Sequence, residues 1–144
     1  MGKKRIVKKG GSGVDAGRQS RALSRMPRKR MEKGTLHIHA TFNNTQVMLS
    51  DQNGNAVVSS SSGALGFKGA KKSTPYAAAK VGELIGEKAL MIGVKEANVV
   101  IRGVGPGRES ALRSFAGKGI GISVIRDDTP VPHNGPRAPK PRRV

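Results

Sequence analysis

Residues 35–42, TLHIHATF, alternate strictly between polar and apolar side chains, and this alternation constrains the fold more than any other stretch. In an extended chain one face would carry the apolar side chains, at Leu36, Ile38, Ala40 and Phe42. A period of two is typical of a β-strand with one face in the core and the other outside it. The stretch therefore predicts a half-buried strand at the start of the ordered domain.

Two further strands are predicted directly after the first. Asn43-Asn44 turns the chain into residues 46–50, QVMLS. Asn53-Gly54 is the strongest short hairpin signal and leads into residues 55–60, NAVVSS. We expect the three strands to form an antiparallel meander.

An amphipathic helix is predicted over residues 75–92, after a long loop containing three glycines and three lysines. Ser73 or Thr74 can cap its first turn, Pro75 suits its first position, and Gly93 can end it. Its apolar face repeats at spacings of three and four, at Ala78, Val81, Ile85, Ala89 and Ile92.

The second half of the domain predicts a strand, a short helix and a last strand. Residues 97–102, ANVVIR, resemble a buried strand, and the loop GVGPG separates them from a helix at 106–117 containing Leu112 and Phe115. Residues 121–126, GISVIR, form the last strand. The order βββ-α-β-α-β predicts an α/β domain, whose parallel crossovers make a mixed sheet flanked by helices.

Both ends of the chain are predicted to lie outside this domain, which we place at residues 35–126. Residues 1–34 carry twelve bases and two acids and indicate a disordered basic extension, in which a helical turn around residues 18–26 can form on binding. Residues 127–144 indicate an extended, basic tail, because five of the last sixteen residues are proline. Polyproline geometry keeps such a tail extended before binding, so that it loses less entropy on docking than a flexible linker.

The formal net charge of +18 indicates a polyanionic partner. Nucleic acid is favoured over an anionic membrane, because no helix pairs a basic face with exposed bulky apolar residues. Only four aromatic residues are present, which favours recognition of the backbone and shape of folded RNA over stacking of many bases. The chain has no cysteine, no apolar run of ~20 residues and no apolar signal segment, so we expect a cytosolic protein without a membrane partner.

The sequence offers no complete metal or cofactor site. His37 and His39 share a strand face, but the one other histidine, His133, lies in the tail, and zinc needs three or four ligands. We expect the pair to pack under a helix or to touch RNA. The stretch RGVGPGRES lacks the Gly-Lys-Ser/Thr of a Walker loop and the ribose-binding acid of a dinucleotide fold, so no cofactor is predicted.

Two glycine-rich loops before helices predict phosphate contacts. In the first, glycines at 103, 105 and 107 would let backbone N–H groups face outward beside Arg108 at a helix start. The alternative for this loop is a tight turn that merely needs glycine. The second loop repeats the arrangement, with lysines at 68, 71 and 72 before the helix at 75–92.

Catalysis is the less favoured alternative. A nucleic-acid phosphodiesterase or nuclease would need converging carboxylates, and the predicted strands offer almost none. Asp127-Asp128, before Thr-Pro, is typical of turn chemistry.

Four long motifs, in order from about Met26 to Val144, resemble the ribosomal protein S-eleven family of the small subunit, most closely its bacterial form. They are HIHATFNNT, DQNGNAVVSSSSGALGFKGAKKSTPYAAA, GVGPGRESALR and DDTPVPHNGPRAPKPRRV. Residues 1–24 extend beyond the usual bacterial start, and their charge fits additional RNA contact.

The resemblance implies a ribonuclease-H-like motif without catalytic acids, in a structural protein rather than an enzyme. It implies a place on the platform of the small subunit in the cytoplasm, where the protein bridges several ribosomal RNA helices and lines the cleft of the Shine–Dalgarno helix of messenger RNA. The implied neighbours are small-subunit ribosomal proteins seven and eighteen, with initiation factor three nearby. With the charge pattern, the resemblance assigns rRNA contact to Lys68, Lys71, Lys72, Gly105, Gly107, Arg108, Arg113, Arg126, His133, Asn134, Arg137, Lys140, Arg142 and Arg143.

Overall fold

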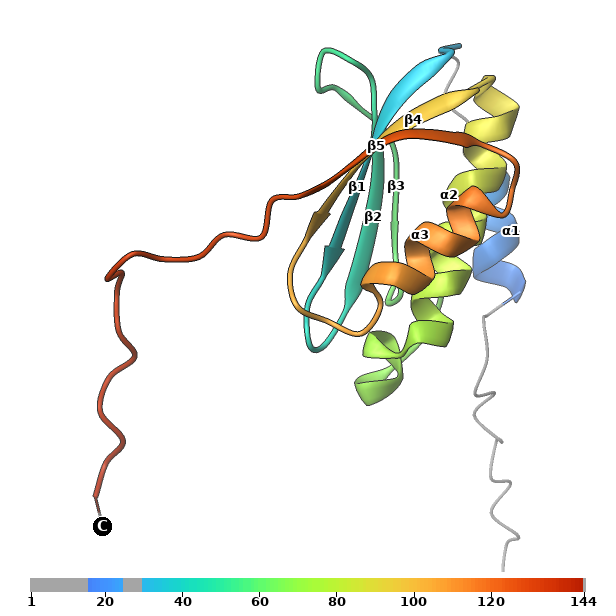
Figure 1. The fold of residues 1–144 in the computed structure, drawn as a ribbon. Coiled ribbons are helices and arrows are strands. Elements are labelled where there is room, and N and C mark those ends of the chain that lie inside the picture. The colour runs from blue at the N-terminus through green and yellow to red at the C-terminus, as the bar shows by residue number, and fades with distance from the viewer. Residues whose placement is uncertain (1–15, 25–29, 144) are drawn as a thin grey trace, which may run out of the picture.

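A five-stranded sheet organises the chain, and helices α2 and α3 lie against one of its faces (Figure 1). The computed structural model describes residues 16–24 and 30–143. The described elements are α1 (Ala16–Ser24), β1 (Lys33–Ala40), β2 (Thr45–Ser50), β3 (Ala56–Ser61), the short 3-10 helix η1 (Gly69–Ser73), α2 (Pro75–Ile92), β4 (Glu96–Arg102), α3 (Arg108–Ala116) and β5 (Gly121–Asp127). From β1 onward this is the predicted order βββ-α-β-α-β, with η1 added before α2.

The sheet is mixed, as predicted, with the strand order β3-β2-β1-β4-β5. β2 runs antiparallel to β1 and β3, whereas β1, β4 and β5 are mutually parallel. Four of the five strands therefore point the same way. The segments that follow β1, β3, β4 and β5 consequently leave the sheet at its same end.

Helix α2 has the predicted start and end. The Thr74 hydroxyl accepts a hydrogen bond from the Ala77 N–H at 3.3 Å, so the N-cap is Thr74 rather than Ser73. Pro75 occupies the first turn, and Gly93 ends the helix with φ of 97°. The buried face of α2 covers β2 and β3.

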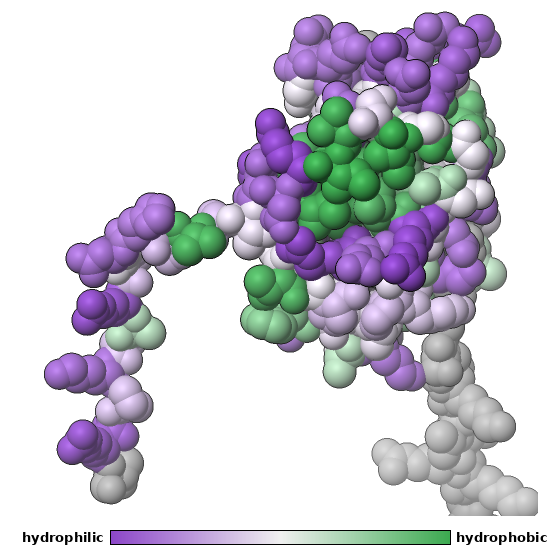
Figure 2. All heavy atoms as spheres, in the orientation of Figure 1, coloured by the Kyte–Doolittle hydropathy of each residue, from purple (hydrophilic) through white to green (hydrophobic). Residues whose placement is uncertain are grey.

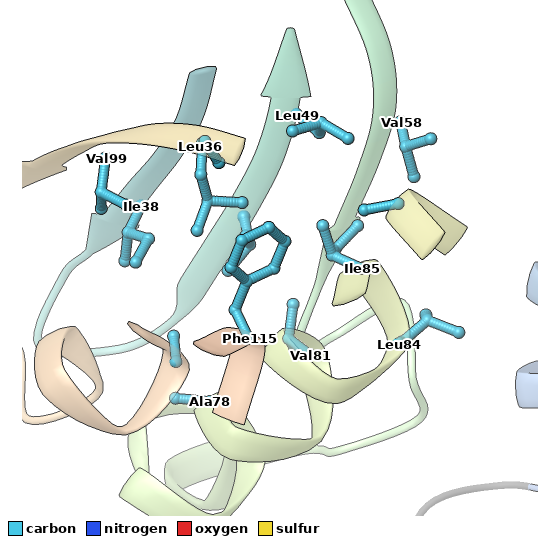
Figure 3. Close-up of a cluster of buried hydrophobic side chains, with 14 of the residues drawn as sticks. Leu36, Ile38, Leu49, Val58, Ala78, Val81, Leu84, Ile85, Val99 and Phe115 are labelled. Carbon is cyan, nitrogen blue, oxygen red and sulfur yellow. The ribbon is translucent and has the colours of Figure 1, made fainter. Parts of the chain in front are cut away.

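The core lies between the two helices and the sheet (Figure 3). Phe115 of α3 is fully buried and points toward Leu36 and Ile38 of β1. Replacing such a phenylalanine by alanine costs about 3–5 kcal/mol. The helices cross closely, since a methyl group added at Gly82 would lie 2.4 Å from the Ala111 carbonyl oxygen. α3 is thereby fixed against α2 as well as against the sheet.

The first predicted strand is shifted by two residues. β1 begins at Lys33 and ends at Ala40, and Phe42 is 72% exposed, so its predicted place on the buried face is wrong. The reason is a turn: the Thr41 hydroxyl accepts a hydrogen bond from the Asn44 N–H at 3.0 Å, and the Thr41 N–H donates to the Asn44 carbonyl. Phe42 lies at the tip of this turn.

Within the N-terminal extension, Ala16–Ser24 form helix α1, which overlaps the predicted helical turn at 18–26 and lies beside α2 (Figure 1). Of the remaining residues predicted to be disordered, 1–15 and 25–29 lie outside the described residues, whereas Lys33 and Gly34 belong to β1, so the predicted disorder is wrong for these two. Among the described helices, none is both long and apolar enough to cross a membrane.

Candidate nucleic-acid interface

Most of the predicted RNA-binding residues lie in segments that leave the sheet at one end. The lysine loop, residues 62–74, follows β3; the glycine loop, residues 103–107, follows β4; the tail follows β5. In open α/β sheets, ligands bind beyond the carboxyl ends of the strands. The topology therefore gathers three segments that lie far apart in the sequence into one candidate site.

The lysine loop presents cations beside the start of α2. Lys68 and Lys71 are exposed, and Lys72 is half-buried. Among the described residues, no carboxylate forms an ion pair with any of the three. The N-terminus of an 18-residue helix adds its own partial positive charge. This part of the predicted site can receive a phosphate directly.

The glycine loop is different, and the expectation that its N–H groups face outward is wrong at two positions. The Gly103 N–H donates to the Thr129 hydroxyl at 3.2 Å, and the Gly105 N–H donates to the Ala40 carbonyl at 2.9 Å. A methyl group at Gly105 would lie 2.1 Å from the Thr41 carbonyl oxygen, and Gly103 has φ of 94°. The alternative holds here: this close turn against the end of β1 requires glycine.

Arg108 joins the glycine loop to the root of the tail. Its half-buried guanidinium donates hydrogen bonds to the Gly103 carbonyl, to the Asp127 carboxylate and, at 3.3 Å, to the Thr129 hydroxyl. Asp127 in turn accepts hydrogen bonds from the Thr129 N–H at 2.9 Å and the Thr129 hydroxyl at 2.5 Å. We call Arg108, Asp127 and Thr129 the tail clasp.

The clasp holds Asp127 as a carboxylate. The hydrogen bond from the Thr129 hydroxyl, followed by that from Arg108, lowers the pKa of the Asp127 carboxyl to about 2. Charge-assisted bonds of this kind are stronger than neutral ones, so the direction in which the tail leaves the sheet is fixed. The sequence indicates a turn at Asp127-Asp128 but gives no sign of its long-range partner.

Beyond the clasp, the described part of the tail has no helix or strand and stands away from the domain (Figure 1). Figure 2 shows that its surface is mostly hydrophilic. Among the described residues, Asn134 is the one non-glycine residue with a positive φ, 54°, which bends the chain beside the equally exposed His133. The four predicted anchoring bases follow this bend and are exposed, at Arg137, Lys140, Arg142 and Arg143.

Arg113 and Arg126 lie outside the three segments. Arg113 of α3 forms an exposed ion pair with Glu109 at 3.2 Å, and Arg126 of β5 pairs with Asp128 at 2.9 Å. Exposed pairs contribute about 0–1 kcal/mol, so an RNA phosphate can displace either carboxylate.

A sequence model of the family described as Ribosomal protein S11 matches residues 34–143, which run from the start of the sheet to the end of the described tail. The chain belongs to the ribosomal protein S11 family. It is therefore a structural ribosomal protein of the small subunit and binds ribosomal RNA there. The lysine loop, the clasp and the tail all lie inside the match.

One acid of the ordered core, Asp51, lies at the turn between β2 and β3. Asp51 accepts hydrogen bonds from the Asn55 N–H at 2.8 Å and the Asn55 side chain at 3.1 Å, so it serves the hairpin turn. The described residues contain no group of three or more His, Asp or Glu placed to hold a metal ion.

The sequence did not assign a role to the sheet face that carries His37 and His39. His37 and His39 lie on the sheet face opposite α2 and α3, so the expectation that they pack under a helix is wrong for this pair. Their alternation with Leu36 and Ile38 already places them on the non-core face. Arg102, beside His39 on β4, was not predicted as a site residue at all.

Proposed function

We propose that the chain ties several helices of small-subunit ribosomal RNA together on the platform of the subunit. It also lines the cleft that holds the Shine–Dalgarno helix of messenger RNA. In this role the protein performs no reaction. The elements from β1 to β5 form the folded body, and the tail that follows β5 serves as an anchor.

The observation that carries the proposal is a basic, extended tail whose root is fixed to the domain. The tail clasp fixes the point at which the tail leaves the end of β5. The four exposed basic residues of the tail lie farther along, away from the sheet. At ~3.1 Å per residue, the fourteen residues 130–143 reach roughly 40 Å. A protein of this shape can hold one RNA helix at the lysine loop and thread its tail along another.

The fourteen assigned residues take different parts in this binding. Lys68, Lys71 and the bases of the tail neutralise phosphates, because their charges are exposed. Gly105 and Gly107 set the shape of the glycine loop beside the root of the tail, since both glycines are buried against neighbouring segments. The basic residues 1–24 add further RNA contact.

Protein neighbours complete the proposed setting. The family resemblance implies small-subunit ribosomal proteins seven and eighteen beside the chain, and initiation factor three nearby. Val124 and Ile125 on the edge strand β5 are 56% and 57% exposed. Such an apolar surface on an edge strand suits a neighbouring ribosomal protein.

Directed cleavage tests this placement. The sequence contains no cysteine, so single cysteines at Lys68, Arg143 and, as a control on α2, Leu90 can each carry a tethered iron chelate. In reconstituted small subunits, we expect the first two positions to cleave different rRNA helices and to cleave messenger RNA upstream of its start codon. Cleavage of a single RNA helix from both positions, without cleavage of messenger RNA, would contradict the proposal.

A further inference from the structure

The face of the sheet opposite the helices carries an open groove of about 530 Å³. It is built from two rows of cross-strand neighbours, each running over β3, β2, β1 and β4. The first row is Ser59, Met48, His37 and Val100; the second is Ser61, Gln46, His39 and Arg102. Neighbours in such a row lie ~4.5–5.5 Å apart, so each row forms one continuous surface.

We propose that this groove binds a single unstacked nucleotide of RNA, with its base on the first row and its phosphate at Arg102. The inference rests on the proposed RNA-binding function and names a further site for it. The groove volume falls within the range of ~300–1,000 Å³ that small-ligand sites occupy.

The first row suits the face of a base. The half-buried Met48 supplies apolar, polarisable surface beside the largely buried Val100, and His37 supplies a flat ring whose Nε2 lies 3.0 Å from the Ser50 hydroxyl. Burial, with a smaller effect of Arg102, lowers the pKa of His37, so the ring is neutral at neutral pH. A base can stack on a neutral ring without an added charge, much as bases stack on aromatic side chains in single-strand binding proteins.

The second row suits the polar edge and the phosphate of the nucleotide. Gln46 and Ser61 offer both hydrogen-bond donors and acceptors. Arg102 is the one permanently charged residue among those that line the groove, and none of the lining residues is acidic. Its side chain is 59% exposed and lies 3.9 Å from Asp128, which a closer arginine, Arg126, already pairs at 2.9 Å. Arg102 can therefore exchange its ion pair with Asp128 for one with a phosphate at little cost in free energy.

The charge and polarity of the groove favour RNA over a protein as its occupant. A chain of net charge +18 attracts polyanions, and the otherwise largely apolar groove wall carries the hydroxyl groups of Ser59, Ser60 and Ser61 and the amide of Gln46. An apolar helix of a protein partner would leave these groups without hydrogen bonds. Asp128, at the root of the tail, adjoins Arg102, so an RNA strand in the groove continues toward the tail.

The test uses the full chain and two probes, a mixed-sequence 12-nucleotide RNA strand and the same strand in a duplex. His37→Ala and His37→Phe both lose the contact with Ser50, but only the alanine variant loses the flat ring. We expect His37→Ala to bind the single strand at least fivefold more weakly than His37→Phe, the lower end of the loss of one stacked base. Binding to the duplex should not distinguish the two variants, because its bases are stacked on each other.

A second pair of variants avoids the half-buried histidine. Ser59→Glu places a carboxylate in the groove, and Gln52→Glu places the same charge at the exposed β2–β3 turn. We expect Ser59→Glu to weaken single-strand binding several-fold more than Gln52→Glu. Arg102→Gln should lower the log–log salt dependence by ~0.7, the value of one phosphate contact on a single strand.

Equal affinities within both pairs would overturn the inference. Unchanged RNA affinity of Ser59→Glu, together with loss of its incorporation into reconstituted subunits, would also overturn it and identify the face as a protein contact. Failure of the proposed function looks different, because it is seen in the directed cleavage: both tethered positions would then cleave a single rRNA helix and no messenger RNA, whatever the affinities of these variants.

Discussion

The Arg108 guanidinium donates a hydrogen bond to the Asp127 carboxylate, and this contact joins the start of α3 to the end of β5. The same guanidinium reaches the glycine loop through the Gly103 carbonyl. One side chain thus connects the loop, the helix and the root of the tail. We therefore expect Arg108 to act on RNA chiefly by setting the path of the tail.

Arg108→Ala should therefore lower stability as well as RNA affinity. Loss of its bonds leaves the half-buried Gly103 carbonyl without this partner, at a cost of about 1–2 kcal/mol. Arg113→Ala is the matched control, because its ion pair is exposed, and it should change stability by less than about 0.5 kcal/mol. Thermal unfolding and rRNA titration measure both effects. An unchanged melting temperature for Arg108→Ala, with a salt slope reduced by one full contact, would instead show direct phosphate binding.

The Asp127 carboxyl should titrate with a midpoint near pH 2 in the folded chain. A lowered pKa stabilises the fold at pH values above the ordinary pKa of 3.8, and this contribution is lost as the pH falls through about 2. Thr129→Val and Arg108→Gln each remove a hydrogen bond that lowers the pKa of the Asp127 carboxyl, so each should raise the midpoint. Carbon-detected NMR titration of the carboxyl measures this, and a wild-type midpoint near 4 would be inconsistent with the clasp.

Gly105→Ala should destabilise the domain by about 1–3 kcal/mol, the usual cost of overpacking. The added methyl group would lie 2.1 Å from the Thr41 carbonyl oxygen, so the glycine loop would have to move away from β1. Gly117→Ala provides a control with helical backbone and a nearest contact of 3.3 Å, and its effect should stay within about 1 kcal/mol. Equal denaturation midpoints for the two variants would refute the close-turn explanation.

Lys68→Ala with Lys71→Ala should weaken rRNA binding without changing thermal stability, since both side chains are exposed. Two lost phosphate contacts should reduce the log–log salt slope by roughly 1.4–1.8. Salt titration and thermal unfolding of the same preparation separate the two effects. A lower melting temperature at unchanged slope would mean that the lysine loop serves the fold.

Local signals in the sequence were sufficient for most of the fold. Asn53-Gly54 forms the predicted turn with Gly54 at φ of 88°, and the cap at Thr74 and the end at Gly93 bound α2 as expected. These features depend on interactions between residues that are close in the sequence, so a local sequence pattern can predict them. Phe42 was misplaced because a side-chain bond of Thr41 ended the strand earlier than the alternation suggested.

The candidate site was only partly predictable, because its decisive contacts are long-range. The sequence shows the lysines of the lysine loop and the helix start that follows them, but only the structure shows that no described carboxylate forms an ion pair with these lysines. The tail clasp could not be recognised from the sequence, because Arg108 and Asp127 come into contact only when β5 pairs in parallel with β4. The groove on the open face likewise depends on the register of four strands.

The central claim, that the tail anchors the protein on RNA phosphates, is tested most directly by the salt dependence of rRNA binding. The variant for this measurement replaces Arg137, Lys140, Arg142 and Arg143 by glutamine and keeps every proline. Four lost phosphate contacts predict that the log–log slope falls by roughly three units while thermal unfolding of the domain is unchanged. A slope equal to that of the unaltered chain would contradict the account, because the tail would then bind something other than phosphate.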